Sequence, residues 1–158
     1  MKLSDKNLRE REFHNKLQSN SKGRFENIFY KAIYNLNEDF FLFLKNNVKD
    51  CEILDYGCGI GSSIEKLIEC NPKKITGIDI SEVSINKAKK RAKNLNIKVD
   101  YQVGNCEKTN LDSDRFDIVY GTGILHHLQF DKCLDEIYRM LKNSGKLIFI
   151  EPLGTNPI

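Results

Sequence analysis

The stretch Glu52-Ile53-Leu54-Asp55-Tyr56-Gly57-Cys58-Gly59-Ile60-Gly61 decides the fold of this 158-residue chain. Its first five residues predict a short strand, and a helix is expected over residues 62–70, where Asn71-Pro72 ends it. Glycines at alternate positions between the two elements allow positive φ angles and a close approach of the backbone to a ligand. The N–H groups at the start of the helix are available to the same ligand. The stretch therefore predicts a binding turn between a strand and a helix.

The spacing of the glycines separates two classes of nucleotide-binding turn. The dinucleotide fingerprint GxGxxG would place its third glycine at position 62, which Ser62 occupies. An NAD(P)- or FAD-dependent oxidoreductase is therefore the less favoured reading. Asp79 stands 24 positions after Asp55, at the end of the second expected strand, where its carboxylate can accept hydrogen bonds from two ribose hydroxyls. The alternative is an aspartate that only caps the helix beginning after Ser81.

From residue 51 onward, short apolar runs alternate with helical patterns, which is typical of βα units that build a parallel sheet. Strands are expected over residues 52–56, 74–79, 98–103, 116–120 and 146–151. Helices are expected over about 62–70, 82–94 and 130–141, the last of them ended by Asn143-Ser144-Gly145. Residues 1–48 are expected to form an N-terminal helical layer or lid on the α/β core of residues 49–158, within one structural domain. Some aromatic residues of this layer could reach a ligand, although such residues at helical spacing are more often core: Phe13, His14, Phe25, Phe29 and Tyr30.

The composition excludes several classes of function. With 25 basic and 22 acidic residues the net charge is +3, too small an excess for a nucleic-acid-binding surface, and the basic run from Lys87 to Lys93 is expected to be a solvated helix face. No apolar run is long enough to span a membrane and no signal-peptide core begins the chain, so we expect a cytoplasmic protein without membrane contact. The five cysteines are never spaced as CxxC, which argues against a disulfide framework and a zinc site.

Together these motifs resemble those of the class I S-adenosylmethionine-dependent methyltransferases. The glycine turn resembles their motif I and Gly77-Ile78-Asp79-Ile80-Ser81 their acidic loop. Further segments match in register: Val103 to Glu107 after strand three, Phe116 to Tyr120 in strand four, and Leu141 to Leu147 before strand five. The resemblance covers about residues 51–153. It implies a three-layer Rossmann-like α/β fold with parallel strands in the order 3-2-1-4-5. The family's usual strands six and seven are lacking, so we expect a C-terminally shortened chain whose exposed sheet edge favours a homodimer.

The resemblance also implies a binding site for S-adenosylmethionine, with S-adenosylhomocysteine as the product and no metal. Asp55 would help to order the glycine turn, Asp79 would hold the ribose and Ile80 would pack on the adenine. Asn105 stands where the family usually has an aspartate, and its amide oxygen can still accept a hydrogen bond from the adenine amino group. The expected cofactor-binding residues are Asp55, Tyr56, Gly57, Cys58, Gly59, Gly61, Asp79, Ile80, Asn105, Cys106, Tyr120, Gly121 and Thr122.

The segment Ile124-Leu125-His126-His127-Leu128 follows strand four at the end of the sheet where open α/β folds bind ligands. A histidine that titrates near neutrality can take a proton from a hydroxyl or amine. The segment is similar to that of small-molecule methyltransferases, and in some that act on sugars a histidine here is the proposed base, supported by a carboxylate after strand five. The expected catalytic residues are His126, His127 and Glu151, with His126 favoured and Glu151 orienting it. The alternative is that both histidines only shape the pocket, because methyl transfer needs little beyond alignment.

The function that this resemblance implies is methyl transfer to the oxygen or nitrogen, or else the carbon, of a small-molecule acceptor. One alternative is a non-catalytic or fragmentary S-adenosylmethionine-binding module, which the short C-terminus favours. Another is an RNA or protein methyltransferase. The modest charge argues against it, as does Tyr120-Gly121-Thr122-Gly123 in place of an NPPY-like motif.

Overall fold

Five parallel strands form the centre of the molecule in the computed structural model, which describes residues 3–19 and 34–151. The strands are β1 (Glu52–Tyr56), β2 (Lys74–Asp79), β3 (Asp100–Val103), β4 (Phe116–Thr122) and β5 (Leu141–Ile150). Their order in the sheet is β3-β2-β1-β4-β5, so the predicted topology is confirmed. The helices are α1 (Asp5–Ser19), α3 (Tyr34–Asn47), α4 (Ile64–Ile68), α5 (Glu82–Asn94) and α6 (Phe130–Met140), with a short 3-10 turn η2 (Leu125–His127).

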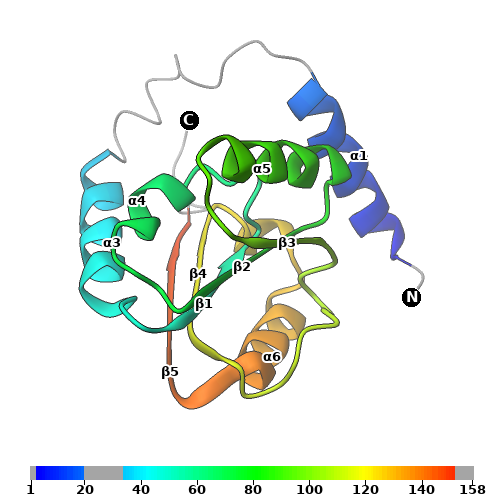
Figure 1. Ribbon diagram of the computed structural model, residues 1–158. Coiled ribbons are helices and arrows are strands. Elements are labelled where there is room, and N and C mark those ends of the chain that lie inside the picture. Colours follow the sequence, from blue (N-terminus) through cyan, green and yellow to red (C-terminus); the bar gives the residue numbers. More distant parts are fainter. Residues whose placement is uncertain (1–2, 20–33, 152–158) are drawn as a thin grey trace.

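The helices cover both faces of the sheet, which gives the predicted three layers (Figure 1). On one face α3 and α4 pack on the strands through Leu44, Leu67 and Ile118. On the other face α6 packs through Ile137 and Met140. The central strands β1, β2 and β4 are buried along most of their length, and most of their residues are apolar because helices cover both faces of the sheet there.

The register brings the carboxyl ends of the strands, which bear the polar residues, to one edge of the sheet. β1 lies in the middle, with Asp55 opposite Gly77 of β2 on one side and Tyr120 of β4 on the other. Asp79 of β2 pairs with Val103 of β3. The glycine turn, the acidic loop and the histidine segment therefore emerge side by side, as the predicted topology requires.

The start of β5 differs from the prediction. Leu141 pairs with Phe116 and Lys146 with Ile118, so residues 142–145 bulge opposite the single residue Asp117. The helix before them ends at Met140 rather than residue 141, and Asn143-Ser144-Gly145 lies within the bulge rather than at the helix end. Glycine is suited to position 145 because any larger residue would place a Cβ 2.8 Å from Leu141 Cδ2, which is too close.

Two other elements are shorter than predicted. The strand expected over residues 98–103 begins at Asp100, and the helix expected over 62–70 spans only Ile64–Ile68, because the glycine turn continues through Ser63. Within residues 3–19 and 34–151 there is no sixth or seventh strand, and β5 pairs only with β4. The expected homodimer through this edge stays a prediction.

The N-terminal layer is described in two parts, α1 and α3. The predicted boundary between lid and core at residues 48 and 49 is not tested, and the candidates Phe25, Phe29 and Tyr30 lie outside the described residues. Among the described helices, none has the length and apolarity to cross a membrane. The expected cytoplasmic location stays a prediction.

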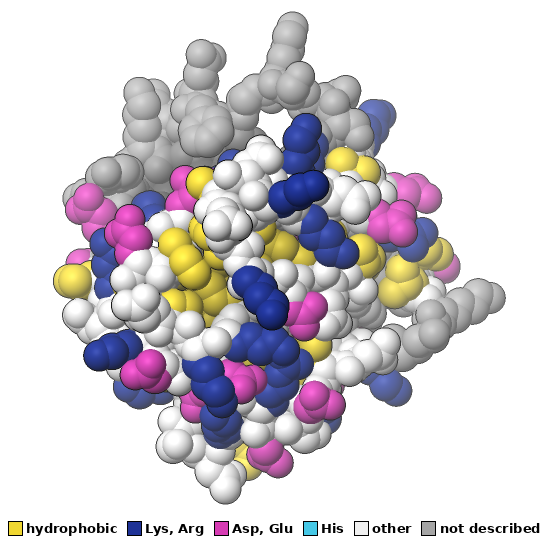
Figure 2. All heavy atoms as spheres, viewed as in Figure 1, with side chains coloured by type: hydrophobic (Ala, Val, Ile, Leu, Met, Phe, Trp, Pro, Cys, Tyr) yellow, Lys and Arg dark blue, Asp and Glu magenta, His cyan; other side chains and the backbone are white. Residues whose placement is uncertain are grey.

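The surface carries charges of both signs. On the face shown in Figure 2, lysine and arginine side chains follow one another down the middle of the molecule, with acidic side chains beside them. On α5, Arg91 Nη1 lies 3.2 Å from Glu65 Oε1. This supports the prediction that the basic run of α5 is a solvated helix face. All five cysteines are free thiols, also as predicted.

Candidate functional site

The glycine turn after β1 has the backbone conformation that its sequence predicts. Gly57, Gly59 and Gly61 have φ angles of +75°, +52° and +69°, in the region that favours glycine. The N–H groups of Gly57 and Cys58 both donate to the carbonyl of Ile78, at 2.9 and 3.0 Å. The turn is therefore fixed against the end of β2.

Asp79 joins the turn to the start of α5. Its Oδ2 accepts a hydrogen bond from Gly59 N at 2.9 Å, and its Oδ1 accepts one from Ser81 N at 2.8 Å. Burial raises the pKa of this carboxyl, and the two amide hydrogen bonds act in the opposite direction. Ser81 Oγ itself caps α5 by accepting from Ser84 N. Each Asp79 oxygen can accept a second hydrogen bond, so a local capping role leaves room for a ligand.

Asp55 lies under the turn and is buried. Its Oδ2 accepts the hydroxyl of Ser63 at 2.5 Å, and Ser63 Oγ is also 3.2 Å from the hydroxyl of Tyr120. Burial raises the pKa of Asp55 to about 6, against the effect of the hydrogen bonds from Ser63 and Tyr120. These contacts connect the two ends of the turn, in agreement with the ordering role expected of Asp55.

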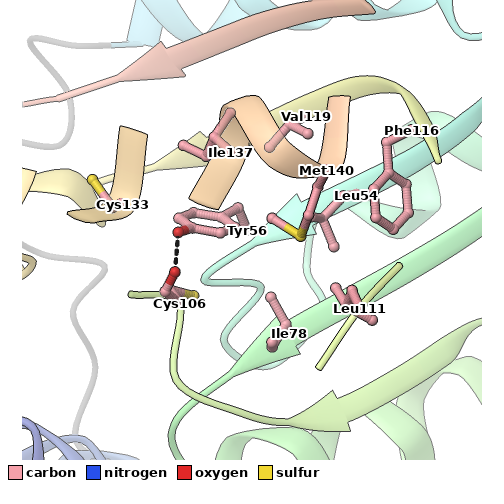
Figure 3. Packing of buried hydrophobic residues seen from close by; sticks show 10 residues of the cluster. All are labelled: Leu54, Tyr56, Ile78, Cys106, Leu111, Phe116, Val119, Cys133, Ile137 and Met140. Carbon is pink, nitrogen blue, oxygen red and sulfur yellow. Dashed lines mark hydrogen bonds between the residues drawn. The ribbon is translucent and has the colours of Figure 1, made fainter. Parts of the chain in front are cut away.

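The wall behind the turn is part of the hydrophobic core. The Tyr56 hydroxyl donates to the backbone carbonyl of Cys106, which connects β1 to the loop after β3 (Figure 3). Leu54, Ile78 and Met140 pack around the Tyr56 ring from three different elements. The loop that carries Asn105 and Cys106 is thus held in place from inside the protein.

A cavity partly open to solvent lies at this edge of the sheet, between the glycine turn, the loop after β3, the segment after β4 and α1. Nine of the candidate residues named from the sequence line it: His14, Gly57, Gly59, Asp79, Ile80, Asn105, Cys106, Thr122 and His127. The other expected cofactor-binding residues lie outside the lining: Asp55, Tyr56, Cys58, Gly61, Tyr120 and Gly121.

The buried position of Tyr120 differs from the cofactor-binding position expected of it. Its side chain is 1% exposed and packs among the residues under α3 and α4, on the face of the sheet away from α6. Thr122, two residues later, is the strand-four residue that reaches the cavity. Six further residues line the cavity and were not among the site residues predicted from the sequence: Asn7, Glu10, Ser84, Gly123, Ile124 and Leu128.

Helix α1 covers the cavity through polar contacts. Asn7 Nδ2 donates to Glu107 Oε2 at 3.0 Å, and Asn15 Oδ1 accepts from Ser81 Oγ at 2.5 Å. Between these two points Glu10 Oε2 lies 3.2 Å from His127 Nδ1. The helix therefore forms one side of the cavity.

The three expected catalytic residues lie together beyond β4. His126 Nδ1 is 2.7 Å from Glu151 Oε2, and Glu151 Oε1 accepts hydrogen bonds from the amides of Ile124 and Leu125. Burial alone would raise the pKa of Glu151, but the hydrogen bonds from His126 and these amides outweigh it and lower the pKa. The ring of His127 lies 4.0 Å from that of His126, and burial together with His126 lowers its pKa. His127 lines the cavity, and His126 lies beside it.

Comparison with known proteins agrees with this geometry. The chain is 29% identical over 139 residues to the ubiquinone biosynthesis O-methyltransferase of Pelagibacter ubique, covering 79% of this chain and 57% of that enzyme. It is 31% identical over 101 residues to phosphoethanolamine N-methyltransferase 3 of Arabidopsis thaliana, covering 63% of this chain and 21% of that enzyme. Among solved structures, geranyl diphosphate C-methyltransferase of Streptomyces coelicolor A3(2), in complex with Mg²⁺, geranyl diphosphate and S-adenosyl-L-homocysteine, superimposes with a TM-score of 0.74. That match covers 94% of this chain and 65% of the other at 17% identity, which shows a shared fold.

A family model described as a methyltransferase domain matches residues 54–149. The match begins in β1, just before the glycine turn, and ends in β5, so it contains both the turn and Asp79. The chain spans about half or less of the length of the two curated relatives named above. This chain belongs to the methyltransferase domain family.

Proposed function

We propose that the chain binds S-adenosylmethionine in the cavity at the edge of the sheet and transfers its methyl group to a small-molecule acceptor. The observation that carries the proposal is the Asp79 carboxylate, hydrogen-bonded to Gly59 of the glycine turn at the wall of that cavity. Membership in the methyltransferase domain family supports the reaction type.

The residues of the cavity suit the parts of this cofactor. The remaining lone pairs of Asp79 can accept both ribose hydroxyls. Gly57 and Gly59 carry no side chain, which leaves space for the methionine portion beside the turn. Ile80 offers an apolar surface to the adenine. Asn105 Oδ1 already accepts Glu107 N at 2.9 Å and has one lone pair left for the adenine amino group.

When bound, the cofactor supplies a methyl group on a positively charged sulfur, so the acceptor's lone pair forms the new bond as the carbon–sulfur bond breaks and a neutral thioether leaves. The chain's own contribution is alignment and exclusion of water. Ile124 and Leu128 line the cavity near the histidine segment, and α1 covers it. His126, held at Nδ1 by Glu151, accepts the proton that a hydroxyl or amine acceptor loses.

A small-molecule acceptor is supported by the relatives and by the charge of the chain. The two curated relatives are by name an O-methyltransferase of ubiquinone biosynthesis and an N-methyltransferase of phosphoethanolamine. A net charge of +3 gives no electrostatic reason to prefer a nucleic acid. The acceptor atom is therefore an oxygen or a nitrogen, or else a carbon.

Calorimetric titration with S-adenosylmethionine and S-adenosylhomocysteine tests the cofactor. Asp79→Ala removes two charge-assisted hydrogen bonds and should weaken binding by at least about 100-fold, because each such bond contributes about 1.5–3 kcal/mol. Glu82→Ala is the matched control, since Glu82 is an exposed carboxylate at the start of α5. Urea unfolding of each variant separates loss of binding from loss of fold. If the wild type binds neither compound, the proposal is wrong, and equal binding by Asp79→Ala excludes only the ribose role.

The proposed base is tested by transfer of labelled methyl groups to a panel of small hydroxyl- and amine-bearing acceptors. His126→Ala should bind S-adenosylhomocysteine as the wild type does, while turnover falls by about 10²- to 10⁴-fold. Glu151→Gln should lower turnover less, because it disturbs only the orientation of His126. Full turnover by His126→Ala would remove this residue from the mechanism.

A further inference from the structure

Three side chains meet where α1 lies over the cavity. Glu10 and His14 are four residues apart and share one face of α1, and His127 belongs to η2. Glu10 Oε2 is 3.2 Å from His127 Nδ1 and 3.7 Å from His14 Nε2. One nitrogen or oxygen atom from each residue lies within 4.8 Å of those from the other two. The methyl-transfer chemistry proposed above requires neither Glu10 nor His14.

These separations match those of ligands on one metal ion. Zinc lies about 2.0–2.2 Å from imidazole nitrogen and carboxylate oxygen, so two ligands of a tetrahedral ion are separated by about 3.4 Å. The two measured distances to Glu10 lie on either side of that value. The ligand nitrogens of His14 and His127 lie within 4.8 Å of each other, so these rings must turn toward each other for all three atoms to reach bonding distance.

We propose that Glu10, His14 and His127 hold a divalent transition-metal ion of the Zn²⁺ class, which fastens α1 to η2. Two imidazoles and one carboxylate are a set typical of zinc and of non-haem iron, whereas Mg²⁺ prefers oxygen ligands alone. All three residues line the cavity, so the remaining coordination positions of the ion face its interior. A water or an oxygen atom of a bound small molecule occupies them.

The surroundings hold the two histidine rings and the helix in place. The His127 ring packs against His126, whose Nδ1 is bound to Glu151, and the His14 ring packs edge-on against Phe13. Contacts to α1 on both sides of the cluster, Asn7 to Glu107 and Asn15 to Ser81, fix the helix relative to the sheet. Such support from neighbouring residues is what keeps metal ligands in position.

No metal was expected from the sequence, because the cysteines are not spaced as zinc ligands and methyl transfer needs no metal. His14 and His127 are 113 positions apart, and only the docking of α1 brings them together. The inference concerns α1 and stands independently of the proposed methyl transfer.

Metal binding is tested with full-length protein that carries no histidine tag and has been stripped with a chelator. Calorimetry should show one Zn²⁺ per chain and no binding of Mg²⁺ at the same concentration. Glu10→Gln and His14→Ala should each weaken Zn²⁺ binding by at least about 100-fold, because even partners outside the ligand set are worth about 10- to 100-fold. Glu12→Gln, an exposed position on the same helix, is the control and should bind Zn²⁺ as the wild type does.

Spectroscopy and hydrogen exchange distinguish this site from adventitious binding. Co²⁺ should give visible d–d bands without a thiolate charge-transfer band, because the ligands are nitrogen and oxygen. In the wild type Zn²⁺ should slow amide exchange in α1, and in His14→Ala it should not. A thiolate band, undiminished binding by both variants, or no binding by the wild type would overturn the site. Binding without protection of α1 would overturn its fastening role. All these measurements are made without cofactor, so their failure is separate from that of the proposed function.

Discussion

Gly57→Ala and Gly59→Ala should rank in opposite orders in two measurements: Gly57→Ala should lose more stability, and Gly59→Ala should lose more ligand affinity. Both residues have positive φ angles, so each alanine costs about 1–2 kcal/mol in backbone strain. At Gly57 the new Cβ would stand 2.6 Å from Ile124 Cγ1, too close for real atoms. Displacing Ile124 adds about 1–3 kcal/mol, the usual cost of overpacking. At Gly59 nothing lies within 4 Å of a Cβ, so strain is the whole cost.

The difference between the two variants is therefore about 2 kcal/mol of unfolding free energy. For a chain of this length that corresponds to a melting temperature about 6 °C lower for Gly57→Ala than for Gly59→Ala. Calorimetric melting of the two proteins under identical conditions measures it. Ligand binding should follow the other order, because the Cβ of Gly59→Ala would project into open space at the cavity wall, where the cofactor needs room, whereas that of Gly57→Ala meets Ile124. Gly59→Ala should weaken S-adenosylhomocysteine binding by about 10-fold or more, which corresponds to about 1.4 kcal/mol.

Two results would refute this reasoning. Equal melting temperatures would show that Ile124 moves away from the methyl group of Gly57→Ala without loss of stability. Unchanged binding of S-adenosylhomocysteine by Gly59→Ala would show that the open space beside Gly59 is not where the ligand lies. Unfolding is followed without ligand, so the two results are independent.

Two further predictions concern buried carboxyl groups. The pKa of Asp55 is raised to about 6 by burial, so the folded state binds its proton more tightly than the unfolded state and is destabilised as pH rises from about 4 to 7. Asp55→Asn keeps an acceptor for Ser63 and is not subject to this loss. As pH rises over that interval, its free energy of unfolding, measured with urea, should therefore increase by about 3 kcal/mol relative to that of the wild type. Burial alone would raise the pKa of Glu136, but hydrogen bonds from Arg139 and Thr109 lower it, so its stabilising effect is present above about pH 4.3 and lost as pH falls further. The free energy of unfolding of Glu136→Gln should therefore be about 2 kcal/mol lower than that of the wild type at pH 7, and the difference should be much smaller near pH 3. Equal differences at the two pH values would contradict this.

The parts of the fold that the sequence predicts accurately depend on local signals. The strands at residues 52–56 and 74–79 and the helix at 82–94 have the predicted bounds. The two strands are short apolar runs, and Ser81 caps the helix through its own side chain. The glycine turn is equally local, since its positive φ angles are a property of Gly57, Gly59 and Gly61 themselves.

The parts that were predicted incorrectly depend on a second segment. Residues 141–145 read as the end of a helix because Asn143-Ser144-Gly145 favours a turn, yet Leu141 already pairs with Phe116 of β4. Only the neighbouring strand shows that the turn is a bulge within β5. Tyr120 and Thr122 are two positions apart and so lie on the same face of β4. Only Thr122, at the carboxyl end of the strand, reaches the cavity, whereas Tyr120 is buried under α3 and α4, and the sequence alone does not say how far the cavity extends along the strand.

An N-terminal layer on the core was expected, but the residues through which α1 docks left no signal in the sequence because their contacts are polar. A helix whose buried face carries Asn7, Glu10 and Asn15 cannot be told from one that faces water, since patterning detects apolar residues. The same property has a consequence for ligand entry. Three such contacts contribute about 1 kcal/mol each, so α1 would leave its place in roughly one molecule in a hundred. Amide hydrogens of α1 should therefore exchange far faster than those of β1 and β4, and equally slow exchange would show that α1 is held by more than these contacts.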